Sequence, residues 1–367
     1  MSCGCLATFE GIEWAPYQIS YTLNKRTVSM EPANAKTYSV SRSIHYGLFL
    51  VFEGIRFYVK KVGGNLTMTF LNPELNAKRF REGMSFSLSP EQQELIPSEE
   101  EIQELIFRYL RHPKMRSFLR MMARDQSQGY LRPYTLDHAQ SIGVSFPNNP
   151  VIRVIASRYK SYLGEPFHGV AIPYIVRTVG INGTGRLKLG NNYPLSIRAV
   201  AEARKIIPKA GAALFLDDRP YDRLEDRKVT EWDSSCFMLA LKNGSVIKIP
   251  DNNLILSSVT IKGLTRILQD FNVVVEERNL TYGELIDLVN NREVVTACSV
   301  GTAGILNRCS SLVLIDSNRN RLGVLEADAS HPLFRRLADV KQYYWDLYRG
   351  TAKVPTGINR LEYAVKA

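Results

Sequence analysis

The sequence predicts an α/β protein built from two domains, each a mixture of strands and helices. Its 367 residues are enough for two domains of ordinary size. Strand-like runs and runs with helical periodicity occur in both halves of the chain, which favours two α/β or α+β domains over one all-α or all-β domain. The composition, 45% hydrophobic and 23% charged, is that of a globular chain with a large core.

The first half opens with residues 1–40, which carry no strong signal for helix or strand. Two apolar runs joined by Gly63-Gly64-Asn65 then predict a hairpin. Ser98 and Glu101 form a capping box before a run with a 3.6-residue apolar period, which predicts a helix. The elements expected here are strands at 55–59 and 66–70, helices at 73–84 and after 98, and extended segments from 132 and at 151–157.

The second half is expected to alternate strands and helices more regularly. Its predicted strands are 170–176, 212–216, 235–241, 246–249, 273–277, 294–299 and 311–315, and its predicted helices are 194–207, 260–271, 281–290 and 333–348. Gly164 and Pro166 mark residues 159–168 as a linker. We therefore predict an N-terminal extension of undetermined structure (1–40), a small domain (41–158), this linker, a large domain (169–350) and a C-terminal tail (351–367).

The net charge of +11 raises the possibility of a nucleic-acid-binding protein. However, basic residues are spread along the chain, and the densest segment, Arg108–Arg124, has apolar residues at helical spacing. This pattern predicts an amphipathic helix with a solvated basic face, so we expect neither nucleic acid nor a membrane as partner.

Several other classes of protein do not fit the sequence. The five histidines show no metal-ligand spacing, so no metal site is expected. The five cysteines, Cys3 and Cys5 among them, form no C-x-x-C pair, and neither a secretory signal nor a membrane-length apolar run is present. A cytoplasmic protein with reduced thiols is the expectation.

Lys188 stands in an unusual place. It lies within residues 185–193, among glycines, asparagines and Tyr193, directly before a helix that opens with Pro194. An ammonium group in such a turn must reach water or take part in chemistry. A desolvated lysine loses its proton readily and can form a Schiff base with an aldehyde, and pyridoxal phosphate is the aldehyde most often held in this way.

A pyridoxal phosphate site needs further groups, and the chain has a candidate for each. Arg79, on the expected helix 73–84, and Thr260 and Thr302, at turns beside regular elements, could hold the phosphate. Glu231, at the start of an apolar strand, could face the pyridine nitrogen of the cofactor. Tyr193 could bind the 3′-oxygen of the cofactor. Taken singly, each of these residues also has an ordinary structural explanation, such as a helix cap or a surface charge.

Together and in order, these segments resemble the class IV, fold type IV, pyridoxal phosphate enzymes, and specifically the branched-chain amino acid aminotransferase group. The resemblance runs from about Ser41 to Gly350. It is carried by His45-Tyr46-Gly47 with Phe52-Glu53-Gly54, Asn76-Ala77-Lys78-Arg79, Tyr130-Leu131-Arg132-Pro133, Lys188-Leu189-Gly190-Asn191-Asn192-Tyr193, Thr230-Glu231 before Cys236-Phe237, and Gly301-Thr302-Ala303.

The resemblance implies a role for each matched residue. Lys188 would form the Schiff base with pyridoxal 5′-phosphate and act as the general base and acid. The implied cofactor-binding residues are Lys188, Arg79, Tyr193, Glu231, Val259, Thr260 and Thr302. The implied substrate-binding residues are Tyr46, Phe52, Tyr130, Arg132, Thr302 and Ala303, with Arg132 taking the second carboxylate of glutamate or 2-oxoglutarate. The resemblance further implies a homodimer, a fold like that of D-amino acid aminotransferase with a smaller N-terminal and a larger C-terminal domain, and a cofactor in the cleft between them.

The substrate-facing segments depart from the family pattern, while the cofactor residues match it. Asn191 replaces a glycine of the lysine motif, and one extra residue lies between Tyr46 and Phe52. Ser257-Ser258 stands where proline-glycine is common, and Glu231 is followed by Trp232-Asp233-Ser234-Ser235 instead of small residues and an asparagine. These departures indicate an altered substrate pocket.

We therefore expect a transaminase that moves the amino group of an L-amino acid, branched or otherwise apolar, to a 2-oxo acid such as 2-oxoglutarate. Another reaction of the same scaffold stays open: the elimination run by aminodeoxychorismate lyase, a D- or (R)-selective transamination, or a transamination of specialised metabolism. A binding protein that kept the fold is disfavoured, since Lys188, Glu231, Arg79 and Tyr193 are all retained.

Overall fold

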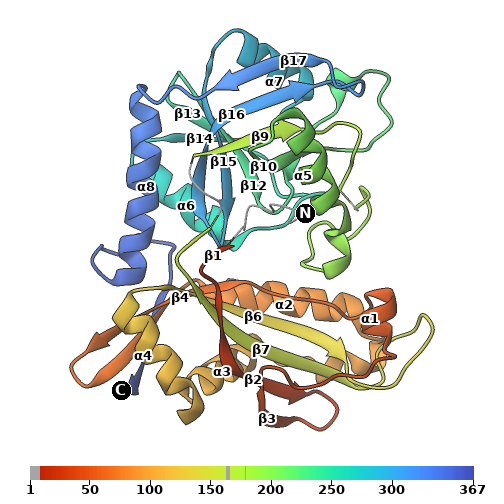
Figure 1. The fold of residues 1–367 in the computed structure, drawn as a ribbon, viewed down its shortest axis with the longest axis vertical. Helices are drawn as coiled ribbons and strands as arrows, with labels where there is room; N and C mark the ends of the chain where they lie inside the picture. The colour runs from red at the N-terminus through yellow and green to blue at the C-terminus, as the bar shows by residue number, and fades with distance from the viewer. Residues whose placement is uncertain (1–8, 163–165, 178) are drawn as a thin grey trace. The chain divides into compact units, whose positions relative to one another are not determined.

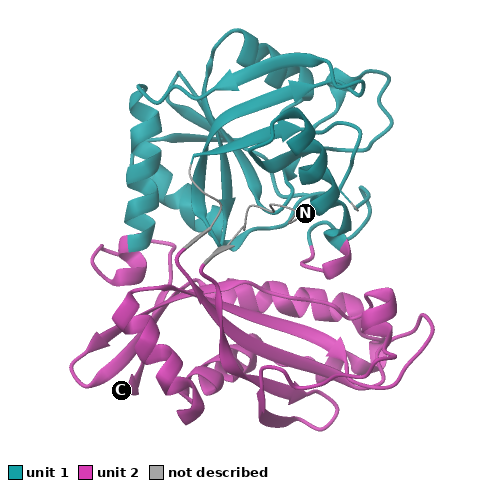
Figure 2. Ribbon diagram, viewed as in Figure 1, with its two compact units in different colours: residues 1–8, 162–186, 192–345 teal, residues 9–161, 187–191, 346–367 magenta. Residues whose placement is uncertain are grey.

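The computed structural model describes residues 9–162, 166–177 and 179–367. It divides into two compact units, coloured separately in Figure 2. The N-terminal unit consists of Phe9–Ser161, Leu187–Asn191 and Asp346–Ala367. The C-terminal unit contains the described residues of Tyr162–Arg186 and Asn192–Trp345. The boundaries expected from sequence did not include the return of Leu187–Asn191 to the N-terminal unit. Cys3, Cys5 and Gly164 lie outside the described residues.

The N-terminal unit is built on an antiparallel seven-stranded sheet with the order β18-β5-β4-β6-β7-β2-β3 (Figure 1). The strands are β2 (Glu13–Thr22), β3 (Thr27–Pro32), β4 (Ile55–Val62), β5 (Asn65–Leu71), β6 (Gln128–Asp137), β7 (Pro150–Tyr159) and β18 (Arg360–Lys366). The predicted hairpin at 55–70 is confirmed as β4 and β5. Two further strands of two residues, β1 (Phe9–Glu10) and β8 (Ser161–Tyr162), lie outside the two large sheets.

Three strands of this sheet come from segments whose structure the sequence did not reveal. β2 and β3 lie within residues 1–40, and β18 lies in the C-terminal tail. β3 and β18 are the two edge strands, and every residue of each is partly or fully exposed. Apolar and polar residues nevertheless alternate in both strands, and their apolar side chains, Val28 and Met30 in β3 and Leu361, Tyr363 and Val365 in β18, pack against the core. The period-2 pattern was therefore present in these two segments, and the sequence analysis missed it.

The helices of this unit are α1 (Arg42–Tyr46), α2 (Pro73–Ser87), α3 (Glu99–Arg111) and α4 (Arg116–Asp125), with 3₁₀ turns η1 (Pro90–Leu95) and η2 (Pro113–Met115). The capping box predicted at the start of α3 is confirmed. The prediction of a single amphipathic helix over Arg108–Arg124 is wrong, because α3 ends at Arg111 and α4 begins at Arg116. His112 adopts an extended conformation before Pro113, as residues before proline tend to do, and this separates α3 from α4. Apolar residues of α2, α3 and α4 join the strands in one core.

The C-terminal unit contains a nine-stranded mixed sheet. Its strands are β9 (Phe167–Ala171), β10 (Ala210–Leu216), β11 (Val229–Trp232), β12 (Cys236–Leu241), β13 (Ser245–Lys248), β14 (Val274–Glu277), β15 (Val294–Gly301), β16 (Ile305–Ile315) and β17 (Arg321–Glu326). Eight of the strands follow the order β11-β10-β9-β16-β15-β12-β13-β14, and the ninth, β17, pairs with β16. Because β11 also pairs with β12, the sheet closes on itself. The strand predicted at 170–176 instead ends at Ala171, and β17 has no counterpart in the prediction.

Helices bury both faces of this sheet. They are α5 (Pro194–Ile206), α6 (Val259–Asp270), α7 (Tyr282–Asn290) and α8 (Pro332–Arg349), together with the 3₁₀ turn η4 (Leu224–Asp226). Ala199 and Ala203 of α5 pack on β9, β10 and β16 in one apolar cluster, whereas Tyr282, Leu285 and Val289 of α7 belong to another. The four predicted helices of this half are confirmed, and so is the α/β fold class.

Candidate functional site

Lys188 is held by a short ladder within the N-terminal unit. Its carbonyl accepts the N–H of Phe52 at 3.0 Å, and the N–H of Gly190 donates to the carbonyl of Leu50 at 2.9 Å. Val51 and Leu189 form the antiparallel bridge between these two bonds, and both side chains are buried in the core. The backbone of Lys188 is therefore fixed against the segment that carries Phe52, before the 3₁₀ turn η3 (Gly190–Asn192) begins.

The amine of Lys188 lies in an apolar and cationic environment. Its Nζ is 4.8 Å from the centre of the Phe52 ring. Burial lowers the pKa of Lys188 to about 8, and the nearby guanidinium of Arg79 acts in the same direction. Tyr130 and Glu53 oppose this decrease to a smaller extent. A lysine of this kind supplies a neutral, nucleophilic amine near neutral pH.

Arg79 is oriented by a carboxylate to which the sequence interpretation gave no role. Arg79 Nε and Nη2 donate to the two carboxylate oxygens of Glu53 at 2.7 and 2.8 Å, which is a bidentate pair. Asn76, one helical turn before Arg79 on α2, donates to Glu53 Oε2 at 2.8 Å. The side chains of Arg79 and Glu53 are 6% and 0% exposed. This pair fixes the direction of the guanidinium inside the unit.

Arg132 lies between two aromatic rings. Its guanidinium carbon is 4.6 Å from the ring centre of Phe52 and 5.1 Å from that of Tyr130, and Nη2 donates to the Tyr130 hydroxyl at 3.3 Å. Arg132 is partly buried, and within the described ranges no carboxylate forms an ion pair with it. A partly desolvated cation beside a reactive lysine, without a carboxylate of its own, is suited to bind an anionic ligand.

The segment between Tyr46 and Phe52 contains an unusual backbone conformation. Phe49 is buried and has a φ of 55°, a left-handed value that is uncommon for a bulky residue. The hydroxyl of Thr135 donates to the carbonyl of Phe49 at 2.7 Å and accepts the N–H of Val51 at 3.0 Å. The segment therefore reaches Phe52 in a defined position, while the Tyr46 side chain is 42% exposed.

Asn191 lies against Gly47. A Cβ atom added to Gly47 would overlap the side-chain oxygen of Asn191, so the carboxamide directly contacts the glycine. Gly47 has a φ of 65° and ends helix α1. Asn191 is thus accommodated by a position without a side chain on the facing segment.

In the C-terminal unit, Glu231 lies on β11 and is buried. Its Oε1 is 2.8 Å from Arg177 Nε, and its Oε2 accepts the N–H of Leu256 at 3.1 Å. The guanidinium carbon of Arg177 lies 6.0 Å from the ring centre of Tyr193, which is the N-cap of α5. Glu231, Tyr193 and Arg177 therefore form one cluster.

The start of helix α6 lies in the same unit. Ser258 caps the helix by accepting the N–H of Ile261 at 3.4 Å, and Val259 and Thr260 are its first two residues. The hydroxyl of Thr260 is 3.3 Å from the hydroxyl of Thr302, which follows β15 and precedes Ala303. A helix N-terminus with two hydroxyl groups beside it is suited to bind an anion.

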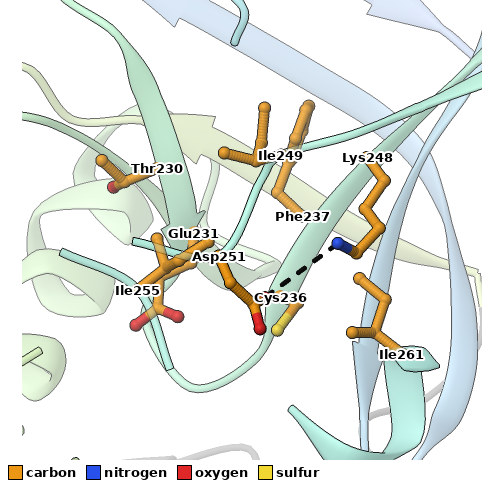
Figure 3. A pocket seen from close by; sticks show the side chains of 9 residues that line it. All are labelled: Thr230, Glu231, Cys236, Phe237, Lys248, Ile249, Asp251, Ile255 and Ile261. Carbon is orange, nitrogen blue, oxygen red and sulfur yellow. Dashed lines mark ion pairs between the residues drawn. The ribbon is translucent and has the colours of Figure 1, made fainter. Parts of the chain in front are cut away.

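A narrow hollow of about 220 Å³, which includes space open to solvent, adjoins Glu231 (Figure 3). Its lining residues are Thr230, Glu231, Cys236, Phe237, Lys248, Ile249, Asp251, Ile255 and Ile261. Lys248 is a second buried lysine, but its Nζ pairs with Glu277 at 3.0 Å and with Asp251 at 4.0 Å. These two ion pairs account for the position of the Lys248 amine, and we assign it no chemical role.

Arg177 and Glu53 are the residues that sequence reasoning missed. Glu53 lies in a quoted motif, but nothing in the sequence indicates which cation it contacts. Arg177 follows the apolar residues Ile175 and Val176, and this was an available signal, because an arginine in a buried segment needs partners. Within the described ranges, no cluster of histidine, cysteine and acidic residues could hold a metal ion.

Comparison with known proteins gives a consistent result. No family model matches the sequence. The chain is similar to branched-chain-amino-acid transaminase 1 of Bacillus subtilis, with 24% identity over 314 residues that cover 83% of this chain and 77% of that protein. It is 22% identical to transaminase AMT5 of Alternaria alternata over 279 residues, which cover 74% of this chain and 67% of that protein.

The same similarity appears in three dimensions. The branched-chain aminotransferase of the archaeon Thermoproteus uzoniensis, solved with norvaline, superposes with a TM-score of 0.66 at 20% sequence identity, and the match covers 92% of this chain and 96% of that chain. A second branched-chain amino acid aminotransferase, solved in complex with N-(5′-phosphopyridoxyl)-L-glutamate, superposes with a TM-score of 0.63 at 20% identity. That match covers 91% of this chain and 95% of that chain. The protein therefore has the fold of the branched-chain aminotransferases, and the predicted fold is confirmed. No helix in the described part of the chain has the length and apolar character needed to span a membrane.

Proposed function

We propose that this protein is a pyridoxal 5′-phosphate-dependent aminotransferase that uses Lys188 as its reactive amine. The observation that carries the proposal is the environment of Lys188, whose amine faces Phe52 and has its pKa lowered to about 8 by burial. The similarity to transaminases in sequence and in fold supports the same conclusion.

The residues present fit this cofactor. In the C-terminal unit, Arg177 Nη2 is buried and has no acceptor among the residues that the structure describes, so the cluster of Glu231 and Tyr193 contains a donor without a protein acceptor. Thr260, Thr302 and the N-terminus of α6 offer donors for a phosphate. We assign Lys188, Arg79, Tyr193, Glu231, Val259, Thr260 and Thr302 to the cofactor. When bound, pyridoxal phosphate would supply a ring that withdraws electrons from the carbon atom bearing the amino group.

Three of these residues then have defined chemical roles. Lys188 would accept a proton at Nζ and deliver it again, which its lowered pKa favours at neutral pH. Glu231, as a buried carboxylate, would stabilise positive charge on the ring nitrogen. Arg79, oriented by Glu53, would neutralise phosphate charge.

We propose that the amino acceptor carries two carboxylates, as 2-oxoglutarate does. Arg132 is held between Phe52 and Tyr130 and can bind the second carboxylate, while Tyr130, Thr302 and Ala303 would take the first. Phe52 and Tyr46 would line an apolar pocket for the amino donor, a branched or otherwise apolar L-amino acid.

We further propose that the active form is a homodimer. Large apolar side chains are exposed in two neighbouring segments of the N-terminal unit, which the bond from Ser141 N–H to the Val40 carbonyl brings together at 3.2 Å. The exposed residues are Tyr38, Val40, Ile44, Tyr46, Ile142, Val144 and Phe146. Apolar patches of this kind on a soluble protein mark interaction surfaces. Sedimentation of the wild type and of Val144→Lys would test this, since the variant should shift toward monomer.

One absorbance experiment tests the proposed activity. Protein loaded with pyridoxal phosphate should show a visible band, and addition of a suitable amino acid should convert it to the pyridoxamine form. Borohydride treatment and peptide mapping should place the cofactor on Lys188. Lys188→Ala should abolish both results, whereas the matched control Lys248→Met should retain them. Cofactor attached to another lysine, or no conversion by any amino acid, would contradict the proposal.

A second experiment tests the acceptor. Arg132→Leu should raise the KM for 2-oxoglutarate at least about tenfold, since a charge-assisted pair is lost. The KM for a 2-oxo acid with one carboxylate should change little. Equal effects on both acceptors would show that Arg132 does not select a second carboxylate.

A further inference from the structure

Arg177 connects three separate parts of the C-terminal unit. Its Nε lies 2.8 Å from Glu231 Oε1 on β11. Its Nη1 donates to the carbonyl of Leu254 at 2.6 Å and to the carbonyl of Gly185 at 3.2 Å. Gly185 is three residues before Lys188 in the chain. One side chain thus joins the proposed cofactor carboxylate to the segment that leads to the proposed reactive lysine.

Maintaining this arrangement is costly for the fold. Arg177 is 6% exposed, and its Nη2 is buried without an acceptor among the described residues. An unsatisfied buried donor and a buried ion pair both carry desolvation costs, so such a residue adds little stability compared with a well-packed apolar side chain. A buried arginine in this place is therefore better explained by a role beyond folding.

The position of Arg177 determines the charge state of its partner. A guanidinium keeps its charge in proteins, and at 2.8 Å it favours the ionised form of Glu231, which burial would otherwise disfavour. Nη1 is held by the carbonyls of Leu254 and Gly185, which orient the planar guanidinium, and Nε then presents one donor to Oε1 of Glu231 from a fixed direction.

We propose that Arg177 is a positioning residue, which orients the Glu231 carboxylate and keeps it ionised so that it can pair with the ring nitrogen of the cofactor. This inference rests on the proposed function and adds a residue to it. It concerns the C-terminal unit alone, where both residues and the ring of Tyr193 lie.

Arg227 provides a matched control within the same unit. Its Nε donates to the carbonyl of Asp217 at 2.6 Å, and it also donates to the carbonyl of Pro173. Its Nη2 is likewise buried without an acceptor among the described residues. Arg227 differs from Arg177 in that no carboxylate within the described ranges forms an ion pair with it. Arg227→Met therefore reports the effect of removing a partly buried arginine whose hydrogen bonds within the described ranges go only to backbone.

The experiment compares Arg177→Met, Arg177→Lys, Glu231→Gln, the double variant Arg177→Met/Glu231→Gln and Arg227→Met. Three quantities are measured: the melting temperature without cofactor, the dissociation constant of pyridoxal phosphate from fluorescence, and the pH dependence of bound-cofactor absorbance. We expect Arg177→Met to raise the dissociation constant about tenfold or more and to shift the absorbance midpoint by about one pH unit. Arg177→Lys should partly restore both, because the charge is kept.

The double variant separates positioning from folding. With Glu231→Gln already present, Arg177→Met should change the dissociation constant by less than about threefold, since the two residues act through one interaction. Arg227→Met should lower the melting temperature while leaving cofactor binding within about twofold of wild type. If Arg177→Met does not fold, the uncharged but polar variant Arg177→Gln takes its place, and wild-type cofactor binding and absorbance in Arg177→Gln would overturn the inference.

The possible failures can be told apart. If Glu231→Gln alters cofactor binding but Arg177→Met behaves like Arg227→Met, Arg177 is a structural residue and the inference is wrong. If Glu231→Gln itself leaves the dissociation constant and the pH profile unchanged, the assignment of Glu231 in the proposed function is wrong, and the role of Arg177 through it is lost as well.

Discussion

Exchange of Arg79 and of Glu53, one at a time, should move the pKa of Lys188 in opposite directions. Burial lowers this pKa from 10.5 to about 8, with Arg79 acting in the same sense and Glu53 opposing it. Arg79→Met removes a cation and leaves the carboxylate, so the pKa should rise. Glu53→Gln removes the anion and leaves the cation, so the pKa should fall.

The magnitude follows from the lowered pKa itself. With a pKa of about 8, about one tenth of Lys188 is neutral at pH 7, roughly 300 times the fraction of a lysine at its ordinary value. Since burial is the largest cause, neither substitution should return the pKa to 10.5. Each single variant leaves a buried charge without its partner and should lose about 3–5 kcal/mol of unfolding free energy. The double variant Arg79→Met/Glu53→Gln should lose less.

The assay is the pH dependence of Lys188 modification in the folded protein without cofactor. An acylating reagent is applied in short pulses between about pH 6 and pH 10, a range that spans the lowered and the ordinary lysine pKa, and peptide mass spectrometry measures the modified fraction of Lys188. Exposed lysines in the same sample serve as the internal reference, and circular dichroism confirms that each variant is folded. A wild-type midpoint near the ordinary value of 10.5, or shifts of the same sign in both variants, would refute the reasoning.

Three further predictions concern stability. Burial raises the pKa of Asp233 from 3.8 to about 6, so the folded state binds more protons than the unfolded state between these values, and stability falls as pH rises through this window. Asp233→Asn should remove this decrease, on the order of 1–3 kcal/mol, in urea titrations at about pH 4 and pH 7; an unchanged pH dependence would exclude Asp233 as its source. Gly47→Ala should be more destabilising in the wild type than in the Asn191→Gly background, because the added methyl group overlaps the Asn191 side chain only in the wild type. In the Asn191→Gly background, only a cost of about 1 kcal/mol for the positive φ of residue 47 is left. Additive effects in this double-mutant cycle would argue against the contact between Gly47 and Asn191. Tyr109→Phe should cost about 1–3 kcal/mol by urea unfolding, because its hydroxyl accepts the buried N–H of Ala156, and no loss would show that this bond is replaced.

The elements that are encoded locally were predictable from sequence. The hairpin of β4 and β5, the capped helix α3 and the helices of the C-terminal unit depend on turn residues, caps and apolar periods within a few residues of each other. The motif around Lys188 also belongs to this group. A glycine-flanked lysine with Tyr193 after it can be recognised from adjacent residues, while its chemical role stays a prediction that rested on several distant segments taken together.

The sequence could not determine which distant segments pair with one another. β2 pairs with β7 and β18 pairs with β5, each far away along the chain, and no local pattern in these strands names the partner. The positive φ of Phe49, whose carbonyl accepts a bond from the distant Thr135 hydroxyl, likewise appears only in the fold.

The sequence by itself determined which side chains are chemically able to form the site: a lysine, an arginine, a glutamate, a tyrosine and threonines in a recognisable order. Only the tertiary structure decided which charges compensate one another. Glu53 contacts Arg79 across 26 residues, and Arg177 contacts Glu231 from a different segment of the C-terminal unit. The physical reason is that a buried charge requires a partner in space, and the position of that partner along the chain is set by the fold and not by any local pattern.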